Sequence, residues 1–261
     1  MNDLVEPALE EVPFELAALA NAHNYNQWIR DLVMPHLGRR ILELGAGIGN
    51  MSAHLPARDL LVLSEADSRL LRMLKSTVEA EFGMAAVNDG RVRVASLNLN
   101  HPVSAQLSDM DFDTVVSFNV FEHIQDDVTA MREVLDLLRR SRAPGPKRVI
   151  TFVPAHQWAY GSMDEVCGHY RRYSKRAFLT LLRCAGLPEE GMGRVKARYF
   201  NLASVPGWFI TTKLLRRRKI DSAALTAFNA LVPLVRPVDD FLLGRLGFPI
   251  GQSLVAVARV D

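Results

Sequence analysis

Short apolar runs alternate with amphipathic stretches along most of the chain. Runs with the length of buried strands are followed by segments whose apolar residues recur at helical spacing. We predict strands at 40–44, 60–65, 91–95, 111–120, 148–153, 194–199 and 253–260. We predict helices at 14–37, 69–82, 128–140 and 174–184. This alternation is typical of an α/β protein.

Residues 203–247 depart from this alternation. Two largely apolar helical stretches lie there, separated by the basic run 216–219, and Pro233 and Pro237 are expected to break the second one. A basic apolar helix can lie on a membrane surface, but docking against the core or against a second copy in a homodimer explains the same pattern. We favour docking, because no second membrane anchor is visible.

Composition narrows the class of protein. The chain has 261 residues, of which 49% are hydrophobic and 23% are charged, so it can bury one large core. A formal net charge of +2 does not call for a nucleic-acid partner. Cys167 and Cys184 are too few for a disulfide framework or a zinc site, so we expect no metal. With no run long enough for stable membrane insertion and an acidic N-terminus, we expect a cytoplasmic protein.

The segment 40–50 carries the clearest chemistry. Gly45, Gly47 and Gly49 follow an apolar strand directly, and such a loop lets a ligand approach the backbone closely. A pyrophosphate loop would read G-x-G-x-x-G, whereas the spacing here is G-x-G-x-G. Glu43, two residues before the first glycine, would repel phosphate but suits an ammonium or a sulfonium ligand.

The stretch from Glu43 to Gly49 resembles the first motif of the class I S-adenosylmethionine (SAM) dependent methyltransferases. Glu65 ends the second strand, where this family binds the ribose hydroxyls. Asn98 stands where the family usually has an Asp for the adenine amino group, and its side-chain oxygen can also accept that hydrogen bond.

The resemblance extends to the fourth strand and implies the fold. Asn119 to His123 is similar to the fourth-strand motif of a large bacterial methyltransferase group, in which asparagine and two apolar residues precede Glu-His. The implied architecture is a seven-stranded, mostly parallel sheet with the last strand antiparallel. The expected cofactor-binding residues are Tyr25, Glu43, Gly45, Ala46, Gly47, Gly49, Asn50, Glu65, Ala66, Asn98, Leu99, Asn119 and Val120.

The N-terminal region precedes this core. We expect residues 1–37 to form a helical lid over a SAM-binding domain that spans 38–261 and carries the insert at about 203–247. Tyr25 and Trp28 lie in a stretch of amides and aromatics. Tyr25 could face the sulfonium from the lid or anchor the core with its hydroxyl satisfied, and the sequence does not decide between the two.

Candidate catalytic residues follow the fourth and fifth strands. His123 is a candidate base, although a histidine that only holds the strand-to-helix turn is an equal alternative. The segment 155–174 is rich in His, Tyr and Arg and leaves the carboxyl end of a central strand, where substrate is handled. There His169 and Tyr170 could orient an acceptor, and 171–173 could bind phosphate or carboxylate.

The function implied by the resemblance is methyl transfer from SAM to O or N of a small metabolite, with S-adenosylhomocysteine (SAH) as product. An alternative on the same fold closes the SAM amino group onto its γ-carbon, giving azetidine-2-carboxylate and methylthioadenosine. Tyr25, Asn119 and Tyr170 could serve that cyclisation. A non-catalytic SAM-binding protein is a third alternative, disfavoured by the polar segment 155–173.

Overall fold

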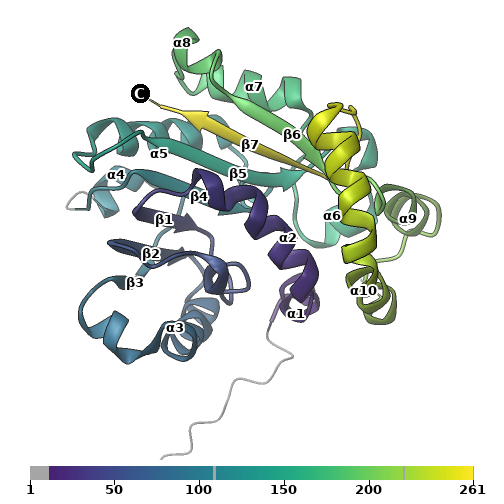
Figure 1. Cartoon of the computed structure of the whole chain (residues 1–261), viewed down its shortest axis with the longest axis horizontal. Coiled ribbons are helices and arrows are strands. Elements are labelled where there is room, and N and C mark those ends of the chain that lie inside the picture. The colour runs from purple at the N-terminus through teal and green to yellow at the C-terminus, as the bar shows by residue number, and fades with distance from the viewer. Residues whose placement is uncertain (1–11, 108–109, 220, 261) are drawn as a thin grey trace, which may run out of the picture.

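The computed structural model describes residues 12–107, 110–219 and 221–260 (Figure 1). Its strands are β1 (Arg40–Leu44), β2 (Leu60–Glu65), β3 (Val92–Ser96), β4 (Thr114–Phe118), β5 (Arg148–Pro154), β6 (Lys196–Phe200) and β7 (Ser253–Arg259). Its helices are α1 (Phe14–Ala20), α2 (His23–Val33), α3 (Ser68–Asn88), α4 (Val103–Gln106), α5 (Asp127–Arg140), α6 (Ser162–Val166), α7 (Lys175–Cys184), α8 (Glu189–Met192), α9 (Val205–Trp208) and α10 (Ser222–Asp239).

The seven strands form one sheet in the order β3-β2-β1-β4-β5-β7-β6. The pairs among β1 to β5 are parallel, and β7 pairs antiparallel with both β5 and β6. The predicted α/β sheet with an antiparallel last strand is therefore confirmed. The strand order reverses between β1 and β4, which is where ligands bind in open sheets of this kind.

Both faces of the sheet are covered, because neighbouring residues of a strand point to opposite faces. Leu42 packs in a cluster with Met131 and Leu138 of α5 and Phe178 of α7. Ile41 faces the other way, into a cluster that includes Trp28 of α2 and Leu74 of α3. The sheet is thus the middle layer of a three-layer structure (Figure 1).

One expectation about helix ends is confirmed and another is wrong. Gly83, with φ 75°, has a non-helical backbone and ends the first helical stretch of α3, and a second stretch continues to Asn88. Pro233 and Pro237 lie inside α10 and do not interrupt it. A proline removes one backbone donor, and here the loss is tolerated within a helix that packs on α2 through Val232 and Phe228.

The insert forms helical segments on the outside of the α/β core. Helix α9 runs into η6 (Phe209–Leu214), and α10 runs into η7 (Asp240–Arg245). Asn229 accepts a hydrogen bond from the Tyr25 N–H at 3.0 Å, and Arg236 pairs with Asp31 at 2.8 Å, which fixes α10 to α2. None of the helices in the three described ranges has both the length and the apolarity to span a bilayer.

Candidate active site

The glycine loop lies at the carboxyl edge of the sheet, between the N-terminal helix and the end of β4. Gly45 has φ 61°, and a Cβ atom there would lie 2.7 Å from Cγ2 of Val120. A Cβ atom on Gly47, with φ 59°, would lie 3.1 Å from Cδ1 of Leu16 in α1. Glycine is needed at both positions because the backbone is left-handed and the neighbours are close.

Glu65 is fixed beside this loop by backbone donors. Its Oε2 accepts the Gly47 N–H at 2.9 Å, and its Oε1 accepts the N–H groups of Ala66 and Asp67 at 2.7 and 2.9 Å. These three bonds take three of the roughly four lone-pair positions of the carboxylate, which leaves about one for a ribose hydroxyl. The loop and the carboxylate form one preorganised unit.

Glu43 and Asn50 have partners within the chain. Glu43 is buried and accepts a hydrogen bond from Ser52 Oγ at 2.5 Å, while burial raises the pKa of its carboxyl group to about 7. Asn50 donates from Nδ2 to the Leu16 carbonyl at 2.7 Å. The side chain of Asn50 therefore ties α1 to the glycine loop.

The expected adenine edge follows β3. The side-chain oxygen of Asn98 accepts the Asn100 N–H at 2.9 Å, so the atom expected to bind adenine takes part in its own turn. The Asn98 backbone N–H donates to Gln106 at 3.4 Å. Leu99 lies next to this turn, and its side chain packs against the core.

Three non-glycine residues after successive strand ends have a left-handed backbone. Asn119 follows β4 with φ 52°, His156 lies after β5 with φ 64°, and Asn201 follows β6 with φ 61°. Such conformations are costly for residues with a Cβ atom and gather at functional sites. They mark the carboxyl edge between β4 and β6 as the second half of the site.

Glu122, His123 and His169 come together at this edge. Glu122 and His123 lie in the short helix η4 (Phe121–His123), while His169 follows α6. One ligand atom of each residue lies within 4.8 Å of the others, and the two imidazole rings are 4.6 Å apart. The Tyr170 N–H donates to the Glu122 carbonyl at 2.7 Å, which joins the two segments.

The electrostatics of this cluster are unusual. Glu122 is fully buried, neither of its carboxylate oxygens has a hydrogen-bond partner among the described residues, and burial raises its pKa to about 8. Burial and the neighbouring His169 lower the pKa of His123 to about 4. A buried carboxyl group without partners is costly, so its retention requires an explanation.

Asp164 organises the segment that carries His169. Its Oδ1 lies 2.8 Å from His169 Nδ1 and 2.8 Å from Arg172 Nε, and its Oδ2 accepts the Gly161 N–H at 2.9 Å. Burial raises its pKa, but the bonds from His169 and Arg172 outweigh this effect and hold the pKa below the usual value. Asp164 therefore stays ionised and orients the His169 ring.

Several candidates named from the sequence have structural contacts. The Tyr25 hydroxyl bonds with Asn201 and Ser253, and its ring lies 5.7 Å from that of Phe200, as expected for a core anchor. The side chain of Tyr170 is exposed.

Residues 171–173, which the sequence offered as a phosphate or carboxylate site, have partners within the chain. Arg171 pairs with Asp127 at 2.7 Å, and Arg172 is buried between Asp164 and the Trp208 ring. The Tyr173 hydroxyl donates to Asp127 at 2.7 Å.

Two residues of this edge were missed from the sequence. The sequence places Glu122 in the Glu-His pair of the fourth-strand motif, but it does not show that the carboxyl group is buried away from polar partners. Asp164 lies five residues before His169, a spacing that becomes informative only once the intervening turn is known. In both cases the role of the residue depends on neighbours from other segments, and the sequence alone does not show which segments meet.

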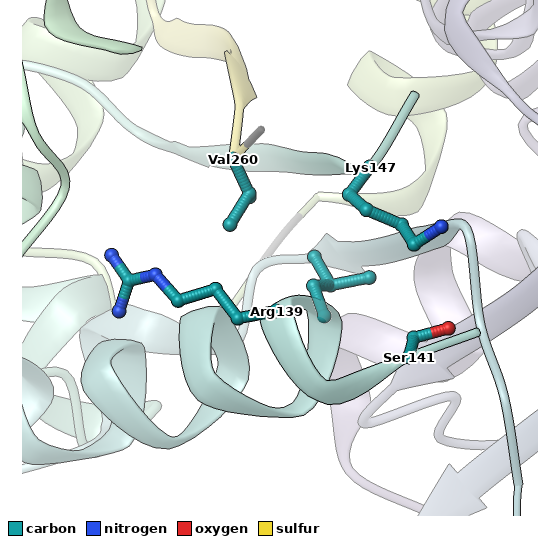
Figure 2. Close-up of a pocket in the computed structure, with 5 residues that line it drawn as sticks. Arg139, Ser141, Lys147 and Val260 are labelled. Atoms are coloured by element: carbon teal, nitrogen blue, oxygen red, sulfur yellow. The ribbon is translucent and has the colours of Figure 1, made fainter. Parts of the chain in front are cut away.

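The hollow in Figure 2 is not part of this edge. It is lined by Arg139, Ser141, Lys147 and Val260 together with Leu138. Lys147 directly precedes β5 and Val260 directly follows the antiparallel β7, so the hollow lies at the amino end of β5. The site described above lies at the opposite end of that strand.

Part of the chain matches the model of a known protein family. Residues 42–141 match the family model described as a methyltransferase domain. No curated protein matches the chain in sequence.

Solved structures share the fold over nearly the whole chain. A SAM-dependent methyltransferase from Thermotoga maritima, described as a possible histamine N-methyltransferase, has a TM-score of 0.59 at 15% identity, covering 95% of this chain and 94% of its own. One from Archaeoglobus fulgidus has a TM-score of 0.53 at 14% identity, covering 90% and 94%. The methyltransferase domain of a bacterial Hen1 has a TM-score of 0.52 at 12% identity, covering 92% and 100%.

Proposed function

We propose that this chain, which belongs to the class I SAM-dependent methyltransferases, binds SAM at the glycine loop and transfers its methyl group to a small-molecule acceptor. The observation that carries the proposal is the bond from the Gly47 N–H to Glu65, because it joins the loop to a carboxylate at the end of β2. Glu65 would accept a hydrogen bond from a ribose hydroxyl, and Gly45 and Gly47 would border the methionine end.

The acceptor would bind at the edge formed by Asn119, His123 and His169. An oxygen or nitrogen of the acceptor attacks the methyl carbon in line, and the electron pair of the breaking carbon–sulfur bond stays on the sulfur of SAH. A proton-bearing acceptor must also lose its proton. His123 is the candidate from the sequence, but burial and the neighbouring His169 lower its pKa to about 4, which leaves it neutral and only weakly basic at physiological pH.

The N-terminal residues would act as a lid on the cofactor side. Residues 1–11 of the predicted lid lie outside the described residues. Helix α1 reaches the loop directly, because Leu16 packs on Gly47 and its carbonyl accepts the Asn50 amide. A lid of this kind keeps water from the reacting centre. Removing the Leu16 side chain should therefore weaken cofactor retention without changing the sheet.

Incubation with SAM, followed by mass spectrometry, tests the reaction class. We expect SAM alone to stay intact, and SAH to form once a suitable O- or N-nucleophile from an acceptor panel is added. Methylthioadenosine together with a cyclic amino acid in the absence of acceptor would overturn the proposal in favour of cyclisation. Tyr25 does not favour that outcome, because its hydroxyl is bonded to Asn201 and Ser253.

A further inference from the structure

The cluster at the end of β4 has the composition of a metal site. Two imidazoles and one carboxylate, with one ligand atom of each within 4.8 Å of the others, match a set of three protein ligands that leaves further coordination positions open. We propose that Glu122, His123 and His169 bind a divalent first-row transition-metal ion at the acceptor end of the site. This proposal departs from the expectation from the sequence that the protein uses no metal.

Glu122 supplies the first independent argument. It is fully buried, and both carboxylate oxygens lack a hydrogen-bond partner in the described residues. A protein gains nothing in stability from such a group, since an apolar side chain of similar shape would be better there. A cation between Glu122 and the two histidines would satisfy the carboxylate.

The surroundings of the histidines supply the second argument. Metal-binding histidines usually donate their other ring N–H to a carboxylate or a backbone carbonyl, which fixes the ring and its tautomer. His169 meets Asp164 through Nδ1 at 2.8 Å, which leaves Nε2 for an ion. The His123 ring has a hydrogen bond to the backbone of Cys167. Both rings are therefore held with one nitrogen free for coordination.

The choice among metals follows from the ligands. Imidazole nitrogens suit Mn²⁺, Fe²⁺, Co²⁺ and Zn²⁺ better than Ca²⁺, which prefers a shell of oxygen ligands. The role of the ion rests on the proposed function: it would lower the pKa of an acceptor hydroxyl, and His123 would be a ligand and not the base. Binding of the ion does not depend on that role and can be measured without SAM.

Cobalt titration tests the site. After treatment with a chelator, the protein is titrated with Co²⁺, and the visible absorption of the bound ion is recorded. We expect one equivalent to bind, His169→Ala and Glu122→Gln to weaken binding at least 10-fold, and Asp164→Asn to weaken it about 10- to 100-fold. The matched control is His36→Ala, which removes an imidazole next to Arg148 and Lys196, at the amino end of β5, and should leave the affinity unchanged.

Two results would overturn the metal site. Wild type that binds Co²⁺ no more tightly than Glu122→Gln, with both proteins folded by circular dichroism, has no such site. Equal loss of affinity in the His36→Ala control would show that binding is not located at the cluster. If Co²⁺ binds as expected but no acceptor is ever methylated, the proposed function fails while the metal site stands.

The insert carries a second, independent feature. Ten of the fourteen exposed large hydrophobic side chains in the described residues lie between positions 209 and 248. Leu231, Leu234, Val238 and Phe241 are spaced by three or four residues, which puts them on one stripe of α10 and η7. The opposite side of α10 carries Val232, which packs in the core. Helix α10 therefore has apolar residues on both its buried side and its exposed side.

Basic residues adjoin this apolar face. The exposed Leu214 and Leu215 are followed directly by the exposed run 216–219, which has three arginines and one lysine, and Arg245 continues the stripe of η7. We propose that this face docks on a membrane surface containing anionic phospholipid. Apolar side chains would enter the headgroup boundary, and the basic run would attract the lipid charge.

The docking face adjoins the acceptor half of the site. Trp208, which directly precedes η6, donates from Nε1 to the Ala159 carbonyl at 3.0 Å, and its ring lies 4.5 Å from the Arg172 guanidinium carbon. Ser162 Oγ donates to the Thr212 carbonyl at 3.1 Å. A membrane bound by this face would therefore lie next to the segment that positions His169.

Vesicle sedimentation tests the docking. Vesicles of phosphatidylcholine with 30% phosphatidylglycerol should pull down the wild type, and Leu234→Glu combined with Phe241→Glu should reduce binding at least 10-fold. The control is Met84→Glu, which places the same charge on an exposed apolar residue of α3 and should have no effect. Equal sedimentation of the wild type and the double variant would overturn the proposal. So would a dimer in analytical ultracentrifugation that the double variant abolishes, with no vesicle binding by the wild type.

Discussion

Two regions of this molecule break the usual distribution of side chains in opposite directions. At the end of β4 and around α6, ionisable groups are buried: Glu122 and Asp164 have no exposed surface. Along α10 and η7, large apolar side chains are exposed, with Leu234 at 74%. Neither arrangement is favoured by folding alone. Each is expected where a binding partner covers the side chains. In the first region the partner would be a small cationic or polar ligand, and in the second it would be the apolar part of a membrane.

The two regions should respond differently to substitution. Changes in the buried polar region should alter stability strongly, because Glu122, Asp164 and Arg172 have been removed from water. Changes on the exposed apolar face should alter binding to a surface and leave stability nearly unchanged.

The largest effect is expected from Asp164→Ala. The substitution leaves the guanidinium of Arg172 buried without its carboxylate and releases His169. Loss of one partner from a buried ion pair costs about 3–5 kcal/mol. Urea unfolding followed by circular dichroism measures this difference, and a loss below about 1 kcal/mol would mean that the region is not buried in solution.

Glu122 should give a smaller, pH-dependent effect in protein freed of metal by a chelator. Its folded-state pKa of about 8 lies above the unfolded value, so its favourable contribution is complete at acid pH and is lost as pH rises through 8. The wild type should therefore lose up to about 1.4 kcal/mol per pH unit relative to Glu122→Gln over pH 6 to 8. Parallel curves for the two proteins in urea unfolding would contradict the buried, unpartnered state.

The smallest effect on stability is expected on the exposed face. Leu234→Glu should change the free energy of unfolding by less than about 0.5 kcal/mol, because the side chain gives up little buried area. Thermal and urea unfolding of this variant beside Val232→Glu gives the comparison, since Val232 is buried on the same helix. A large loss for Leu234→Glu would show that its side chain is covered within the folded protein.

Much of the fold could be predicted because its signals are local. The strand 60–65 matches β2 residue for residue, and 148–153 differs from β5 by one residue, since buried strands in a parallel sheet are continuous apolar runs. The failure at α10 has an equally definite cause: Pro233 and Pro237 are held in the helix by its contacts with α2.

The candidate site divides in the same way. The glycine loop and Glu65 could be identified from spacing, because a turn and its strand are adjacent in sequence. The role of Asp164 and the burial of the Glu122 carboxyl group could not be identified from the sequence. Burial and ion pairing depend on segments that meet only in the folded chain. Arg171 and Arg172 show the converse: basic residues in a polar stretch suggested a ligand, but carboxylates of the same chain already pair with them.

Calorimetric titration with SAH tests the central claim most directly. The cofactor and the acceptor occupy separate halves of the carboxyl edge in this account, so Glu65→Gln should weaken SAH binding at least 10-fold, while Glu122→Gln should bind SAH as the wild type does. The contradicting result is a folded wild type with no affinity for SAH, or equal affinity in wild type and Glu65→Gln.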